Sequence, residues 1–67
     1  MMRSLELDPL IVRVRNEFIE MPGLRLSIPQ AMRLWGVDRE VCQRIVDALV
    51  QASFLRKTSR GDVVRAA

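Results

Sequence analysis

The residue types that build metal sites and many active sites are scarce in this chain. Its 67 residues include no histidine, no tyrosine and a single cysteine, Cys42. A structural zinc site needs four Cys or His ligands, and one cysteine cannot form an internal disulfide. We therefore expect no metal site, and we expect Cys42 to be a reduced, buried thiol, because free cysteines are among the most buried residues.

Catalytic signatures are missing as well. The three glycines do not form a phosphate-binding loop. Without histidine there is no Ser–His or Cys–His pair to activate a nucleophile, and no pair of carboxylates stands where a cleft is expected. We therefore expect a protein that is not an enzyme and that has no cofactor.

Long apolar runs are also absent. No stretch approaches the roughly 20 apolar residues that a membrane span requires. Near the N-terminus, Glu6 and Asp8 interrupt the apolar residues where a signal peptide would have its apolar region. We expect a cytoplasmic protein without a membrane partner.

The chain does hold enough apolar residues for one small core. Hydrophobic residues make up 49% of it, which argues against disorder. Asp8 and Pro9 predict a helix start, with Asp as N-cap and Pro at the first helical position. We therefore expect a single domain over residues 8–66, preceded by an N-terminal arm over residues 1–7, mobile or lying as a flap on the domain or on a second subunit.

The central part of the chain predicts two helices joined by a tight turn. Ser27 and Gln30 have capping-box spacing at the start of the first helix. Gly36 is suited to a left-handed C-cap at its end, and Asp38 is suited to be the N-cap of the second helix, over residues 39–52. Two helices joined in this way form a helix-turn-helix.

The second helix has one apolar and one polar side at 100° per residue. The expected apolar side contains Val41, Cys42, Ile45, Val46, Ala48, Leu49 and Ala52, and the polar side contains Arg39, Glu40, Gln43, Arg44, Asp47 and Gln51. The first helix is expected to bury Ala31, Leu34 and Trp35. For Trp35, packing under the turn and a hot spot for a partner are the two alternatives.

The flanking segments complete the predicted fold. An apolar stripe of Leu10, Ile11, Val14, Phe18 and Met21 predicts a helix over residues 9–21. Residues 24–26 predict a short strand, and residues 54–58 and 63–65 predict a hairpin with Arg60 at its tip. Three helices, a short strand and a C-terminal β-hairpin wing predict an α+β, mainly α fold, the winged helix-turn-helix.

Residues 23–65 also resemble a family of that fold. Leu34-Trp35-Gly36-Val37-Asp38 matches the turn, the positions of Cys42, Ile45 and Leu49 match the helix core, and Ser53-Phe54-Leu55-Arg56-Lys57 matches the strand entry. The chain here is similar to bacterial winged helix-turn-helix transcriptional regulators of the antibiotic-resistance-regulator type. It departs from them at Met32, where Ala is usual, and at Ser53, where Gly is usual.

The resemblance implies a small transcriptional regulator that binds double-stranded DNA. Helix 39–52 would enter the major groove, and the 54–65 hairpin would contact the backbone. The implied DNA-binding residues are Arg39, Gln43 and Arg44 for bases, Lys57 and Arg60, with Arg56 and Arg65, for phosphates, and Ser27 and Gln30 for a phosphate at a helix N-terminus.

Each of these assignments has an alternative. The polar helix face can be a solvated surface with a Glu40–Arg44 ion pair, and the basic hairpin can be a charged sheet edge that resists aggregation. Ser27 and Gln30 can act only as caps. The whole domain can be a protein-interaction or dimerisation module without DNA binding. A further hypothesis is a homodimer that forms through Leu5, Leu7, Leu10 and helix 9–21, with Ile19 on the dimer surface.

Overall fold

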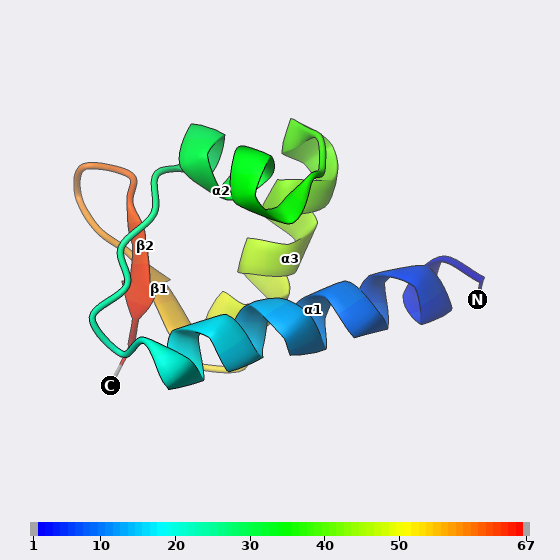
Figure 1. Cartoon of the computed structure of the whole chain (residues 1–67), viewed down its shortest axis with the longest axis horizontal. Coiled ribbons are helices and arrows are strands. Elements are labelled where there is room, and N and C mark those ends of the chain that lie inside the picture. Colours follow the sequence, from blue (N-terminus) through cyan, green and yellow to red (C-terminus); the bar gives the residue numbers. More distant parts are fainter. Residues whose placement is uncertain (1, 67) are drawn as a thin grey trace.

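The computed structural model describes the backbone of residues 2–66 and the side chains of residues 9–66. This part of the chain forms, in order, α1 (Met2–Glu20), α2 (Ile28–Trp35), α3 (Arg39–Gln51), β1 (Leu55–Lys57) and β2 (Val63–Arg65) (Figure 1). The expected fold class, α+β and mainly α, is confirmed. None of the helices in residues 2–66 combines the length and the apolar run that a bilayer crossing requires.

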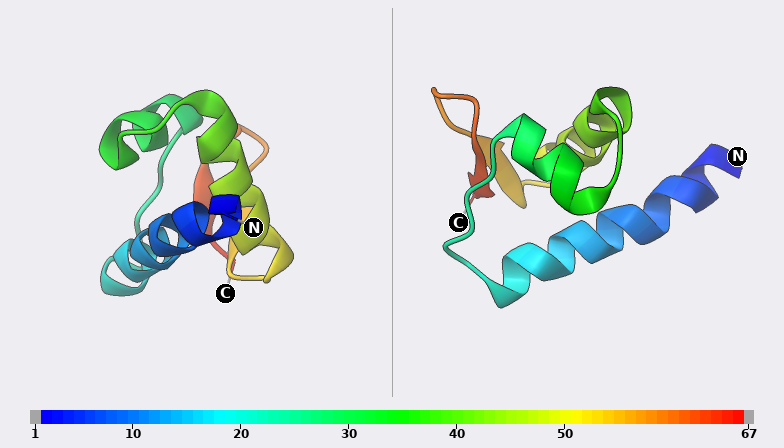
Figure 2. Two further views of the ribbon diagram at one scale, coloured as in Figure 1. Left: turned by 90° about the vertical axis from the view of Figure 1, so that its right-hand side faces the viewer. Right: turned by 45° about the horizontal axis from the view of Figure 1, so that its top comes forward.

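The first helix begins earlier than the sequence predicted. It starts at Met2 and contains Pro9 in its interior, so the predicted helix start at Asp8 and Pro9 is wrong, and residues 2–7 belong to α1. Proline removes one backbone hydrogen bond, but the residues before it are mostly good helix formers, and the helix continues. Its N-terminal end projects past the other elements (Figure 2).

The predicted caps of α2 are confirmed. The backbone N–H of Gln30 donates to Oγ of Ser27 at 3.2 Å, and the backbone N–H of Ser27 donates to Oε1 of Gln30 at 3.0 Å. Gly36 ends the helix with φ +66°, a conformation that glycine adopts without steric cost. The local signals therefore define this short helix at both ends.

The third helix follows directly. Oδ1 of Asp38 accepts a hydrogen bond from the backbone N–H of Val41 at 2.9 Å, as expected for an N-cap. The buried positions of α3 are Cys42, Ile45, Val46 and Leu49, so the expected burial of Cys42 is confirmed. Ala48 and Ala52, expected on the apolar side, are exposed, because the buried stripe is narrower than the apolar one.

The hairpin is antiparallel, with Leu55 opposite Arg65 and Lys57 opposite Val63. The predicted strand at 24–26 is reduced to one bridge, in which Leu26 and Val63 exchange backbone hydrogen bonds of 3.1 and 2.7 Å. Gly61 has φ +91° in the connecting turn, which agrees with the predicted turn. The bridge ties the segment before α2 to β2.

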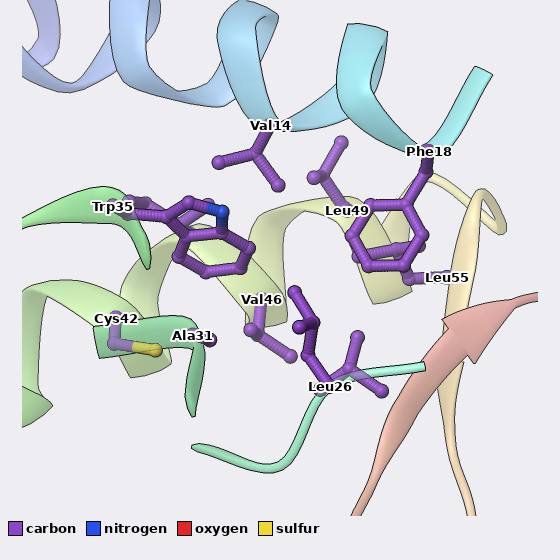
Figure 3. Packing of buried hydrophobic residues seen from close by; sticks show 11 residues of the cluster. Val14, Phe18, Leu26, Ala31, Trp35, Cys42, Val46, Leu49 and Leu55 are labelled. Atoms are coloured by element: carbon purple, nitrogen blue, oxygen red, sulfur yellow. The ribbon is translucent and has the colours of Figure 1, made fainter. Parts of the chain in front are cut away.

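The core lies where α1, α2, α3 and the hairpin meet (Figure 3). Its buried residues are Val14, Phe18, Leu26, Ala31, Trp35, Cys42, Ile45, Val46, Leu49, Leu55 and Val63. Packing of Trp35 in the core is thus confirmed. Met21 and Leu34, which were expected in the apolar stripes of their helices, are 52% and 46% exposed. Met21 follows the last residue of α1 and Leu34 lies on the outer side of α2, so neither reaches the core.

Candidate nucleic-acid interface

The exposed side of α3 carries charges of both signs. Arg39, Glu40, Arg44 and Asp47 are exposed, and Gln43 is half-buried. Nη2 of Arg44 lies 3.2 Å from Oε2 of Glu40, which is the i,i+4 ion pair that the sequence offered as an alternative. Such a pair on an exposed helix face contributes only about 0.2–0.5 kcal/mol, so Arg44 can exchange it for another anionic partner.

Lys57 joins the first strand to this helix face. Its Nζ donates to Oε1 of Gln43 at 3.2 Å and lies 3.9 Å from Oδ1 of Asp47. The side chains of Lys57 and Asp47 are 42% and 63% exposed, and exposed ion pairs of this kind contribute about 0–1 kcal/mol. The contacts make α3 and β1 one continuous polar surface, held by interactions weak enough to be exchanged.

Arg60 lies at the tip of the hairpin and is exposed. The tip is held by hydrogen bonds from the backbone of Thr58 to Asp62 at 2.8 Å and from the backbone of Asp62 to Oγ1 of Thr58 at 3.1 Å. No hydrogen bond or ion pair among the described residues joins Arg60 to α3. The structure therefore places Arg60 on an ordered turn, separate from the Gln43–Lys57 contact.

Arg65 differs from the other basic residues of the hairpin. Its guanidinium carbon lies 4.5 Å from the centroid of the Phe54 ring, and that of Arg15 lies 5.7 Å from the same centroid. Nε of Arg65 is buried. Because Arg65 pairs with Leu55 at the end of the hairpin opposite the tip, it packs on Phe54 instead of extending with Arg60, and it is the weakest of the predicted phosphate contacts.

Ser27 and Gln30 are brought together by the capping box. Oγ of Ser27 and Oε1 of Gln30 both accept backbone hydrogen bonds, which is the capping role that the sequence offered as one alternative. The side-chain amide nitrogen of Gln30 keeps its two donors. A phosphate contact at this helix N-terminus therefore stays a prediction.

Cys42 lies beneath the polar face. Burial raises the pKa of its thiol above the ordinary value, and the nearby charges of Arg39 and Lys57 lower that pKa in part. The thiol is therefore mostly protonated at neutral pH, as befits a packed core side chain.

Two arginines that the sequence did not single out line a hollow beside α2. Arg25 and Arg33 form it together with Leu26, Gln30 and Leu34, and its volume is about 400 Å³. The sequence contained a partial signal for this hollow, because the spacing of residues 30, 33 and 34 places them on one side of a helix. Arg25 comes from the preceding segment, so its position depended on the fold.

Comparisons with protein-family models, with curated proteins and with solved structures find no match to this chain.

Proposed function

We propose that the chain is a winged helix-turn-helix domain that binds duplex DNA as a small transcriptional regulator in the bacterial cytoplasm. Support comes from the order of the elements, in which α2 and α3 are joined at Gly36 and Asp38 and are followed by the hairpin. The bridge between Leu26 and Val63 adds a third chain segment to the hairpin, as this fold requires.

The observation that carries the proposal is the contact between Lys57 and Gln43. It places the exposed side of a capped helix beside a basic strand, so that one continuous polar surface offers donors to bases and a cation to phosphates. An α-helix fits the major groove, where Arg pairs with guanine and Gln with adenine, each good pair giving about 1–3 kcal/mol of discrimination. Arg39, Gln43 and Arg44 are the residues proposed for this role.

The hairpin supplies the electrostatic part of the proposal. Residues 54–67 carry four basic side chains and one acidic side chain, so the positive charge is concentrated at this end. Lys57 and Arg60 would neutralise phosphates, and the release of condensed counterions would then drive association. Ser27 and Gln30, at the N-terminus of α2, are proposed to contact a further phosphate through backbone N–H groups and the Gln30 amide.

An amide NMR titration with a mixed-sequence duplex, at low and at physiological salt, tests the proposal. We expect shifts in residues 39–44 and 57–61 that weaken as salt rises. Arg13→Ala is the matched control, because Arg13 lies on α1, outside both segments. This variant should show the same chemical-shift changes as the parent chain. The absence of shifts in both segments at low salt would contradict DNA binding.

The alternative function is a protein-interaction module without DNA binding. It is favoured by one observation, the near-neutral charge of the α3 face, where Glu40 and Asp47 lie against Arg44 and Lys57. Salt dependence separates the two functions: binding to DNA weakens steeply as salt rises, whereas an apolar protein interface does not.

Homodimerisation through α1 remains a proposal. Val12 and Ile19 are 51% and 44% exposed, and their spacing of seven residues places them on one side of the helix. Leu10 packs partly against the core, and the side chains of Leu5 and Leu7 lie outside the described residues. If α1 forms the contact, Ile19→Glu should convert a dimer to a monomer in analytical ultracentrifugation. A monomeric parent chain would reject the proposal.

A further inference from the structure

The hollow beside α2 combines an apolar floor with a cationic rim. Leu26 is almost fully buried and is fixed by its backbone bridge to Val63. Leu34 is 46% exposed, and the surface of the hollow is mostly apolar. A single exposed leucine is ordinary on a protein surface. Here, however, the leucine lines a hollow together with a second leucine, whose backbone is bridged to Val63.

Every polar side chain around the hollow is a hydrogen-bond donor. Arg25 and Arg33 carry guanidinium groups, which donate and do not accept. Oε1 of Gln30 already accepts a hydrogen bond from the backbone N–H of Ser27, and the amide nitrogen of Gln30 offers two donors. Neither arginine takes part in the ion pairs formed among the described side chains. The hollow is therefore complementary to a group that is anionic and accepts hydrogen bonds.

We propose that this hollow is a docking site for an acidic peptide, in which a leucine-sized side chain packs on Leu26 and Leu34 while neighbouring carboxylates pair with Arg25 and Arg33. Guanidinium groups bind carboxylates through two parallel hydrogen bonds, and a central apolar anchor with a charged rim is the usual arrangement of a small interface. The proposal goes beyond DNA binding, because it names an acidic partner whose site shares only Gln30 with the proposed DNA contacts.

The shape and lining of the hollow favour a peptide over the DNA backbone. Phosphate oxygens satisfy cationic donors, but a phosphodiester chain has no aliphatic side chain to cover the two leucines. The volume of about 400 Å³ lies at the low end of the roughly 300–1,000 Å³ of ligand sites. The hollow is open, so it accommodates a few side chains of a larger molecule and does not enclose a free metabolite.

A display selection from a random peptide library against the full chain tests this proposal. The expected result is enrichment of peptides with Asp or Glu next to Leu, Ile or Phe. Their affinity should fall by at least about tenfold for the double variant R33E/L34E, since both substituted residues would contact the peptide. Both positions are exposed, so the variant should fold, and its circular dichroism and thermal unfolding check that it does.

Met21→Glu is the matched control, because Met21 is about as exposed as Leu34 (52% and 46%) but directly follows α1 and lies in none of the proposed interfaces. It should leave the selected peptides bound. Three results would overturn the proposal: failure to enrich acidic–apolar sequences, equal binding to R33E/L34E, or loss of binding with Met21→Glu. In a duplex titration, shifts at Arg25, Arg33 and Leu34 as large as those in α3 would assign the hollow to DNA instead.

Discussion

The indole nitrogen Nε1 of Trp35 donates a 3.0 Å hydrogen bond to Oε1 of Glu17. The bond joins the end of α2, directly before the Gly36 turn, to the last turn of α1. Trp35 is 3% exposed, whereas the Glu17 side chain is 25% exposed and also lies 3.5 Å from Nε of Arg13. The carboxylate therefore satisfies a buried donor on one side and a solvent-exposed cation on the other.

Glu17→Ala leaves the indole donor without its partner. We expect the free energy of unfolding to fall by about 1–3 kcal/mol, the usual cost of leaving a buried donor unsatisfied. Urea unfolding followed by fluorescence measures it, because Trp35 is the only tryptophan. Glu17→Gln keeps an acceptor and Arg13→Ala removes only the exposed pair, so each should cost less than about 1 kcal/mol. Equal losses for Glu17→Ala and Arg13→Ala would show that the indole bond does not contribute.

Ser53→Gly should stabilise the fold. Ser53 has φ +61°, a left-handed conformation that is strained for a residue with a side chain. The free energy gained by relieving this strain exceeds the cost of the greater conformational entropy that glycine gives the unfolded chain. We therefore expect a gain of about 0.5–1 kcal/mol in the free energy of unfolding. Ser53→Ala retains the strain and should give no gain. Ser59→Gly, at a turn residue without positive φ, should lower stability, and stabilisation by both glycines would argue against the strain.

Ile45→Val tests how tightly the core is packed. Ile45 is fully buried, so loss of one methyl group should lower the free energy of unfolding by about 0.5–1.5 kcal/mol. Ile19→Val, at an exposed position, should change it by less than about 0.5 kcal/mol. Thermal unfolding by circular dichroism compares the two variants. Equal effects would mean that Ile45 is not in a close-packed environment.

Arg44→Ala and Arg60→Ala should have different effects on DNA binding. Loss of Arg44 should weaken binding to a selected specific duplex more than binding to random DNA, because Arg44 is proposed to contact bases. Loss of Arg60 should weaken both equally and should lower the slope of log affinity against log salt by about 0.9, as expected for one phosphate contact. Fluorescence anisotropy at several salt concentrations measures both effects. An equal loss on both duplexes for Arg44→Ala would remove it from base recognition.

Cys42 should make stability depend on pH in the alkaline range. Burial raises the thiol pKa in the folded state, so the unfolded state loses its proton at lower pH than the folded state does. The contribution of the Cys42 thiol to the free energy of unfolding is present in full below the ordinary thiol pKa. It is lost as pH rises through the raised pKa of the folded state. Urea unfolding between neutral and alkaline pH should show this decline in the parent chain, and the decline should be smaller in Cys42→Ala. An identical pH dependence in both would contradict the assignment.

Local signals predicted much of the fold. Ser27, Gln30, Gly36 and Asp38 define helix ends through contacts within a few residues, so the sequence was sufficient to place them. The start of α1 was missed because a proline is compatible both with the first turn of a helix and with an interior position that loses one hydrogen bond.

Contacts between distant segments could not be predicted in the same way. The Lys57–Gln43 contact depends on how β1 packs against α3, and the hollow depends on where the segment before α2 places Arg25. The exposure of Leu34 has a similar cause. A helix as short as α2 has one narrow contact with the core, and Ala31 and Trp35 fill it, so an apolar residue beside them is left in solvent.

The bridge between Leu26 and Val63 makes closure of the core depend on the last strand of the hairpin. Val63 is fully buried, and its backbone exchanges two hydrogen bonds with Leu26, a residue that precedes α2 and α3. The three helices alone would leave the core open on the side that β2 covers, so a chain cut before Val63 would expose the Leu26 edge to solvent.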